Sequence, residues 1–252
     1  MNSRVLETTD NKLLETMNDK VSVARPIIKI AKFVSLGALT LVAMLSIAHL
    51  AWKNSGSNQW ELEIDKNGVK VYSLKSPGSV LKQFKGVTRI KTTLNRAVAS
   101  ALDPDLENCV DWNPSCVKVQ SVEPWNTQGQ YLINLVQSNY PPPFSPRDNV
   151  VKIHVTQDAK SKAVLVEFIA APDRFPKNDC CYRIPRMHNS WRYTPLENGE
   201  IEVEHIQNVD RGLPYIRSNR VTPNGVYRIL LRIPQLLNKE KYHHASFDFI
   251  KS

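Results

Sequence analysis

Histidine and cysteine are the residues of this chain that most often carry chemistry, and their spacing matches no common catalytic or metal-binding motif. The sequence contains 6 histidines and 4 cysteines, but no His-Glu-x-x-His and no Cys-x-x-Cys. Its 9 glycines form no Gly-x-Gly-x-x-Gly loop, and the order of residues suggests no Ser-His-Asp triad. We therefore predict no catalytic residue, no metal site and no cofactor.

His205 belongs to the most regular alternating segment of the chain. Over residues 201–209, apolar or uncharged side chains alternate with the carboxylates Glu202 and Glu204. A period of two predicts a β-strand with its carboxylates in solvent and His205 on the inner face. An inward imidazole could hydrogen-bond a ligand, although a buried histidine more often bonds a neighbouring backbone group.

The stretch PPPFSPRDNVV, residues 141–151, places a stiff apolar loop in front of two opposite charges. Three prolines limit the conformations of the loop, and Phe144 follows them. Arg147 and Asp148 then open an apolar segment that is typical of a strand. We expect this pair of charges to fix the start of the strand, either as a structural ion pair or in contact with a ligand head group.

The cysteines fall into two groups, Cys109 with Cys116 and Cys180 with Cys181. Neighbouring cysteines rarely bond to each other, so a bridge between the two groups is one open pairing. Small buried thiols or one structural disulfide are the simplest interpretations. All four follow a segment that predicts export from the cytoplasm, where disulfides persist.

That segment runs from Phe33 to Trp52. Its 20 residues carry no formal charge, and at about 1.5 Å each they form a helix of about 30 Å, the thickness of a bilayer core. Three basic residues lie just before it and one just after it: Arg25, Lys29, Lys32 and Lys53. The positive-inside rule therefore predicts a single-pass membrane protein with a cytoplasmic N-terminus and an exported domain.

A cleaved signal peptide is the alternative, because Ser46 and Ala48 offer small residues for cleavage after Ala48. The exported domain would then be soluble. The predicted organisation is a cytoplasmic tail (1–32), an anchor (33–52), a linker (53–59), a domain (60–240) and a C-terminal tail (241–252).

The net charge of +9 favours an anionic partner. The basic residues are scattered singly among acidic ones, with no run of four or more, so a nucleic-acid backbone is a poor match. An anionic membrane surface fits better beside a membrane anchor. A protein partner cannot be inferred from these patterns.

Short alternating segments fill the predicted domain. They predict about nine antiparallel strands, because no long helix separates them, and the first two are joined by a turn at Asn67-Gly68. Short helical segments are predicted at 94–102 and up to Trp112, and a longer one at 215–238. Apolar residues recur along this last helix at spacings of three and four, which predicts a wide buried stripe.

Four motifs of the domain resemble the START domain, the StAR-related lipid-transfer family, in its bacterial membrane-anchored form. They are DKNGVKVY with FKGV, the WNPSC segment, SPRDNVV, and RIPRMHNSWRYTPL. The resemblance covers about Trp60 to Leu237. With the predicted orientation, the bacterial form implies an inner-membrane protein whose domain lies in the periplasm or, after cleavage near Ala48, a soluble periplasmic protein. The resemblance implies an α+β helix-grip fold, in which a curved antiparallel sheet encloses a C-terminal helix, and a hydrophobic tunnel that holds one lipid. It also implies that mobile loops and the terminal helix form a lid.

The resemblance gives the candidate site residues their roles. Phe144 would insert among acyl chains at the tunnel mouth, while Val226 and Leu230 would form the tunnel floor. Where many relatives carry a basic residue inside the tunnel, this chain has Ile153, so the lipid cannot be inferred. The complete set of predicted ligand-binding residues is Tyr131, Phe144, Arg147, Asp148, Phe168, Asn189, Trp191, His205, Val226 and Leu230.

Three functions follow from these expectations. The first is binding, and transfer or sensing, of a sterol, phospholipid or other apolar ligand at a membrane, without catalysis. The second is an enzyme of the same superfold, such as a cyclase or hydrolase, with His205 or Asp148 as acid or base. The third is an envelope adaptor with an unused cavity.

Overall fold

The computed structural model of the chain describes residues 32–251. The chain divides into two compact units, Met1–Asn54 and Ser55–Ser252. The first contains the helix Lys32–Asn54, which has a mean hydropathy of 2.0 and is 0% buried, and which is long and apolar enough to cross a membrane. The apolar helix expected at 33–52 is thus present. The predicted cytoplasmic tail lies outside the described residues up to position 31.

The second unit is built on one curved sheet. Thr93 caps the first helix of the unit, because its side chain accepts a hydrogen bond from the backbone N–H of Arg96. The strands are β1 (Trp60–Lys66), β2 (Val69–Leu74), β3 (Gln83–Ile90), β4 (Cys116–Asn126), β5 (Tyr131–Ser138), β6 (Arg147–Gln157), β7 (Val164–Ala170), β8 (Tyr182–Arg183), β9 (Arg186–Pro195), β10 (Ile201–Gln207) and β11 (Val209–Asp210).

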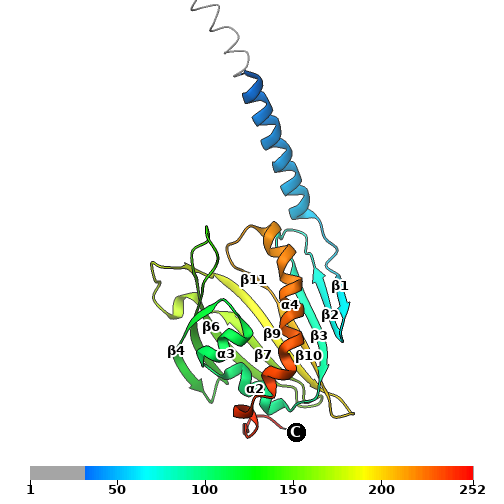
Figure 1. The fold of residues 1–252 in the computed structure, drawn as a ribbon, viewed down its shortest axis with the longest axis vertical. Helices are drawn as coiled ribbons and strands as arrows, with labels where there is room; N and C mark the ends of the chain where they lie inside the picture. The colour runs from blue at the N-terminus through cyan, green and yellow to red at the C-terminus, as the bar shows by residue number, and fades with distance from the viewer. Residues whose placement is uncertain (1–31, 252) are drawn as a thin grey trace, which may run out of the picture. The chain divides into compact units, whose positions relative to one another are not determined.

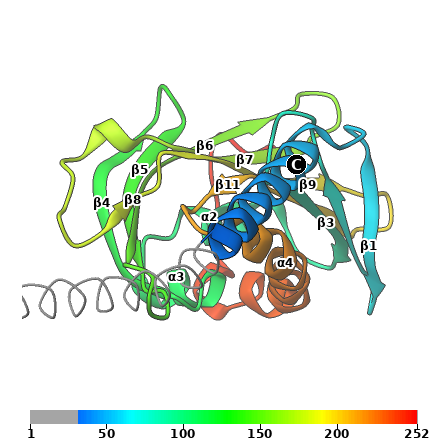
Figure 2. The same cartoon turned by 90° about the horizontal axis from the view of Figure 1, so that it is seen from above.

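The strand order is β1-β2-β3-β10-β9-β7-β6-β5-β4, with β11 paired to β9 and β8 paired to β6. Every pairing is antiparallel except that of β6 with β8. The sheet bends into an arc, and α2 (Leu94–Leu102), α3 (Leu106–Trp112) and α4 (Tyr215–Leu237) lie on its concave side (Figures 1 and 2). The predicted α+β architecture, a curved antiparallel sheet around a C-terminal helix, is confirmed.

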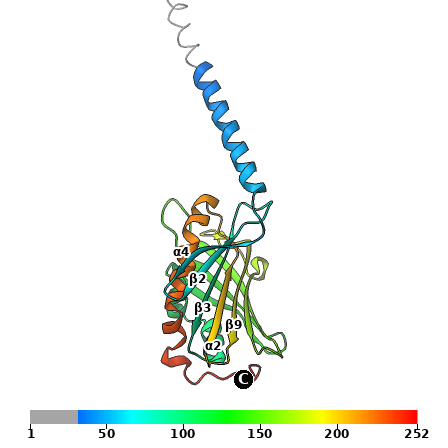
Figure 3. The ribbon, with the colours of Figure 1, turned by 90° about the vertical axis from the view of Figure 1, so that its right-hand side faces the viewer.

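Helix α4 packs directly on one half of this arc. Val226 and Leu230 are each 1% exposed and lie over Gly86 of β3, where an added Cβ atom would collide with both side chains. In side view α4 runs along the sheet beside β2 and β3 (Figure 3). The two prolines inside α4, Pro223 and Pro234, do not interrupt it. Because α4 packs mainly on β2 and β3, the rest of the concave face is covered by α2, which contacts β7 and β9, and by α3, which contacts β4.

The C-terminal segment was predicted as a separate tail, and this prediction is wrong for residues 241–251. Tyr242 is 4% exposed and Ile250 is 8% exposed, so both belong to the core of the domain. The backbone N–H of Phe247 also donates to Asn95 Oδ1 at 3.1 Å. This packing could not be predicted, because the segment is short and its apolar residues have no regular period.

Two disulfides are present, and each joins the two members of one group. Cys109 of α3 is bonded to Cys116 of β4, with their Cα atoms 6.0 Å apart. Cys180 is bonded to its neighbour Cys181. The bridge between the groups that the sequence left open is therefore not formed. The first disulfide ties α3 to the edge strand of the sheet.

Candidate functional site

A cavity of about 510 Å³ lies between α4, α3 and the part of the concave sheet that α4 does not cover. Protein interiors are normally close-packed, so a space of this size is unusual inside a domain of this length. Every second residue of the central strands faces it, as the pleat of a strand requires. The strands β5, β6, β9 and β10 contribute Asn134, Val136, Ser138, Arg147, Asn149, Val151, Ile153, Met187, Asn189, Trp191, Tyr193, His205 and Gln207.

One stripe of α4 closes the cavity, but it is not the stripe that the sequence predicted. The cavity-facing residues recur at helical spacing and are Ser218, Val221, Thr222, Gly225 and Ile229. Val226 and Leu230, predicted as the tunnel floor, lie on the neighbouring stripe against Gly86 and do not line the cavity. The periodicity identified them correctly as buried. It could not tell contact with the sheet from contact with a cavity.

His205 and Trp191 form the polar–aromatic part of the wall. Trp191 is 6% exposed, stacks on the His205 ring with centroids 3.9 Å apart, and meets Trp112 of α3 edge-on at 5.0 Å. His205 Nδ1 lies 3.0 Å from the carbonyl oxygen of Ser190. A carbonyl can only accept, so Nδ1 carries the proton and Nε2 is left as an acceptor. His205 is thus inward and bonded to a neighbouring backbone group, as expected.

Burial lowers the pKa of His205 to about 4. The hydrogen bond to the Ser190 carbonyl raises this pKa, whereas the positive charge of Arg211 lowers it further. The imidazole is therefore neutral at physiological pH. It can bind a ligand through Nε2 as an acceptor, but it carries no charge of its own.

Arg147 lines the cavity at the start of β6 and is only 4% exposed. Its guanidinium donates to three backbone carbonyls, those of Ser145, Arg211 (3.1 Å) and Gly212 (3.2 Å). Three aromatic rings surround it, with centroids 4.9 to 5.7 Å from Cζ: Tyr140, Phe144 and Tyr182. These contacts hold the guanidinium in place without neutralising it.

Asp148 does not pair with Arg147, and the ion pair expected between these neighbours is not formed. Successive residues of a strand point to opposite faces, so Asp148 faces away from the cavity that Arg147 lines. Its partner is Arg183 of β8, with Oδ2 and Nη2 2.7 Å apart and Oδ1 and Nε 3.0 Å apart. Both side chains are almost fully buried. Asp148 is therefore a structural residue on the far face of the sheet.

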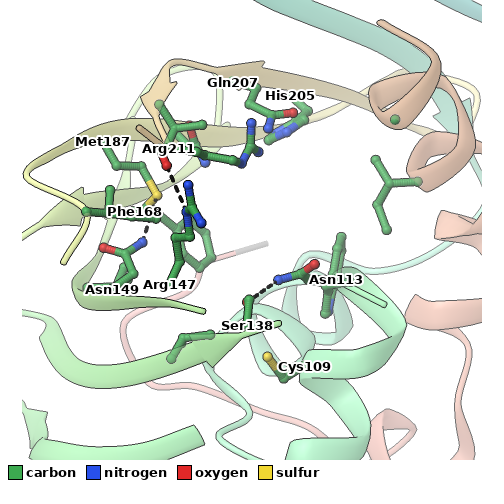
Figure 4. Close-up of a pocket in the computed structure, with 18 of the residues that line it drawn as sticks. Cys109, Asn113, Ser138, Arg147, Asn149, Phe168, Met187, His205, Gln207 and Arg211 are labelled. Carbon is green, nitrogen blue, oxygen red and sulfur yellow. Dashed lines mark hydrogen bonds between the residues drawn. The ribbon is translucent and has the colours of Figure 1, made fainter. Parts of the chain in front are cut away.

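Arg211 is a lining residue that the sequence analysis missed. It lies beside His205 and Gln207 at the same end of the pocket as Arg147 (Figure 4). Burial lowers its pKa, although the phenol of Tyr140 acts in the opposite direction. The alternation that identified His205 could have found it, because Gln207, Val209 and Arg211 continue the same every-second-residue series.

The remaining predicted site residues divide between the cavity and other positions. Phe168 and Asn189 line the cavity, as predicted. Tyr131 does not, because it packs on the opposite face of β5 with Ile133. Phe144 does not line it either, since its ring lies between the guanidinium groups of Arg147 and Arg217, 5.7 and 5.2 Å away. Its insertion into a membrane remains a prediction.

Three buried polar atoms of cavity-lining residues lack a hydrogen-bond partner among residues 32–251. They are the hydroxyl of Tyr193, whose side chain is completely buried, Oδ1 of Asn149 and Oγ of Ser100. Unpaired buried polar groups are rare in folded proteins, and a bound molecule is one way to satisfy them. In the same described range no cluster of histidine, cysteine and acidic residues has the arrangement of a metal site.

The architecture and the cavity together define the class of the domain, which has the START-like helix-grip fold. No family model matches the chain. A solved fragment of a STAR-related lipid transfer protein from Xanthomonas axonopodis superimposes with a TM-score of 0.64 at 22% identity, over 71% of this chain and 99% of that one. Human StAR-related lipid transfer protein 5 gives 0.60 at 16% identity, over 82% and 98%.

A curated relative is also found from sequence. It is an uncharacterized protein of Pseudomonas aeruginosa, 26% identical over 177 residues, which are 70% of this chain and 84% of the relative. At these identities the solved structures establish the fold. The function has to be argued from the cavity itself.

Proposed function

We propose that the domain binds one lipid or lipid-like amphiphile in its cavity and acts as a carrier or sensor rather than as an enzyme. The observation that carries this proposal is a space of about 510 Å³ in the core, walled by apolar side chains such as Ile153 and Phe168 and by a few polar groups. Sites for small ligands have this size and this composition. The fold shared with two proteins named for lipid transfer supports the same function.

Desolvation would drive binding. Each methylene removed from water contributes about 0.8 kcal/mol, but a bilayer offers nearly the same gain. Net affinity relative to the membrane is then small. A binding protein of this kind exchanges its ligand with a membrane instead of extracting it permanently, which suits transfer or sensing.

The nominated catalytic groups support a carrier more than an enzyme. Asp148 lies on the far face of the sheet and is paired with Arg183, so it does not face the cavity. His205 does, but a pKa of about 4 makes it a weak base at neutral pH. We expect lipids incubated with the purified protein to be recovered unchanged. If the wild type converts a lipid to a product and the His205→Ala variant does not, the enzyme hypothesis would be favoured over the carrier.

We place the domain on the periplasmic side of a bacterial inner membrane, anchored by the helix Lys32–Asn54. The basic residues before this helix favour a cytoplasmic N-terminus. The two disulfides favour an oxidising compartment for the domain. Alkylation of a single cysteine placed at Ser3 or at Ser252, with an impermeant reagent on intact spheroplasts, tests this orientation. We expect the Ser252 position alone to react.

Native mass spectrometry of the full chain, released from a mild detergent, tests the proposed function. We expect a fraction of the protein to carry one additional mass that dissociates as an intact lipid. Repeated recovery of folded but empty protein would contradict the proposal and favour the adaptor, in which the cavity has no ligand.

A further inference from the structure

Three charged groups line the cavity, two of them positive and one negative. The positive groups are Arg147 and Arg211, and the negative one is Asp103. Asp103 already accepts from the hydroxyl of Tyr242 at 2.6 Å and pairs with Lys241 at 2.6 Å. Burial raises the pKa of Asp103, but these hydrogen bonds outweigh it and hold the pKa below its usual value. This carboxylate is therefore ionised and already compensated.

The two guanidinium groups have no such compensation. In the part of the chain that the structure describes, neither Arg147 nor Arg211 forms an ion pair with a carboxylate. Of the five N–H groups of a guanidinium, three of Arg147 donate to backbone carbonyls, which leaves two. A buried charge without a counter-ion is costly, so an anion at this place would stabilise the protein.

The geometry brings the two charges to one place. The backbone carbonyl of Arg211 accepts the 3.1 Å hydrogen bond from Arg147 Nε, so the two residues are in contact. Their side chains lie at the same end of the pocket, beside His205 and Gln207 (Figure 4). The neutral imidazole of His205 adds no positive charge there, and Asp148 faces away. The apolar residues Ile153 and Phe168 line the same cavity.

We propose that the ligand is a single amphiphile with an oxyanion head, a carboxylate or a phosphate, held by Arg147 and Arg211, with its apolar part against Ile153, Phe168 and α4. This inference rests on the proposed function, because it specifies the occupant of the same cavity. Guanidinium groups bind carboxylate and phosphate through paired, charge-assisted hydrogen bonds, which no neutral head group can replace. The volume of about 510 Å³ fits one ligand of drug size.

Photolabelling of the full chain in phosphatidylcholine discs at pH 8 tests this proposal. The probes are palmitate and hexadecanol, each with a diazirine in the alkyl chain, and lysophosphatidic acid with the same chain. Peptides that contain cavity-lining residues are quantified by mass spectrometry. We expect palmitate or lysophosphatidic acid to label them at least about tenfold more than hexadecanol, the effect of one charge-assisted hydrogen bond. Whichever of the two anionic probes labels more strongly identifies the head as carboxylate or phosphate.

Substitutions assign the preference to the two arginines. Arg147→Met and Arg211→Met should each reduce labelling by the anionic probes about tenfold and leave hexadecanol unchanged, whereas Arg147→Lys retains part of the preference. Arg89→Met, on an exposed pair with Glu202, is the matched control and should change nothing. If Arg147→Met fails to fold, Arg211→Met decides, because the Arg211 guanidinium interacts with the side chain of Tyr140, whereas that of Arg147 joins three backbone carbonyls.

The failure of this inference can be told from the failure of the proposed function. Equal labelling of the wild-type cavity by hexadecanol and both anionic probes would overturn the oxyanion head and leave lipid binding intact. Persistence of the preference in both methionine variants would also overturn it. Absence of cavity labelling by all three probes would overturn the proposed function together with this inference.

Discussion

Gly86 of β3 lies so close to Leu230 of α4 that no side chain fits between them. A Cβ atom added at Gly86 would lie 2.7 Å from Cγ1 of Val226 and closer still to Cδ1 of Leu230. Glycine therefore lets the helix rest directly on the sheet at this point. This contact sets how far α4 stands from the rest of the arc, and with it the size of the cavity.

Replacement of Gly86 by valine should destabilise the domain by about 1–3 kcal/mol, because the added atoms force α4 away from β3. Gly225 of α4 is the matched control, since a Cβ there meets nothing within 4 Å. Gly225→Ala should leave stability unchanged or raise it by up to about 1 kcal/mol, the difference in helix propensity. Urea denaturation followed by tryptophan fluorescence measures both. Equal stability of the two variants would contradict the packing described.

Asp148 and Arg183 form a buried ion pair, with 1% and 6% of their side chains exposed. Asp148→Asn should cost about 3–5 kcal/mol, because it leaves the Arg183 charge buried without its partner. The double variant Asp148→Leu with Arg183→Met should recover much of this loss. Glu202→Gln, in the exposed pair with Arg89, should cost less than about 1 kcal/mol. Similar losses in Asp148→Asn and Glu202→Gln would show that the pair is not buried in solution.

His205 should make the domain less stable as the pH falls. An unfolded chain protonates histidine near pH 6.5, whereas folded His205 stays neutral down to about pH 4. Between these pH values the unfolded state therefore binds more protons than the folded state. The free energy of unfolding falls by about 3 kcal/mol from pH 6.5 to 4 because of His205. Below pH 4 this group causes no further loss.

His205→Gln should flatten that part of the pH profile, because glutamine does not titrate. His188→Gln is the control, since the His188 side chain is 56% exposed. Denaturation midpoints between pH 4 and 8 compare the two variants with the wild type. A wild-type pH profile in His205→Gln would mean that His205 does not titrate with a lowered pKa.

The disulfide between Cys109 and Cys116 should stabilise the domain by about 2–3 kcal/mol, as expected for a bridge between residues seven apart in sequence. Replacement of both cysteines by alanine should therefore lower the melting temperature. The same double replacement at Cys180 and Cys181 should have a smaller effect, because a disulfide between adjacent residues closes almost no loop and so restricts the unfolded chain little. Differential scanning fluorimetry distinguishes the pairs, and the opposite order would contradict this account.

The alternation of buried and exposed side chains predicted the cavity wall best on strands that have only one deeply buried face. It placed His205 inward, and one step beyond Val209 in the same series reaches Arg211. Tyr131 was predicted to line the cavity without such a signal, because β5 is apolar on both faces, with Leu132 and Ile133 both buried, and a period of two cannot identify its inner face.

Other features depend on contacts between distant segments. Neighbouring charges on a strand cannot pair, so the partner of Asp148 had to come from elsewhere in the chain, and Arg183 is 35 positions away. The apolar stripe of α4 was correctly predicted. Only the three-dimensional structure shows that Val226 rests on Gly86 while Gly225, one residue before it, faces the cavity.

The most direct test of the central claim is the amount of lipid that co-purifies with the wild-type chain, Gly225→Ala and Gly225→Trp. The indole ring of Gly225→Trp would occupy open cavity space without disturbing the contact of α4 with Gly86. We predict that wild type and Gly225→Ala carry equal lipid, and that Gly225→Trp remains folded but carries at least about tenfold less. Equal lipid in all three proteins would show that the cavity is not the binding site.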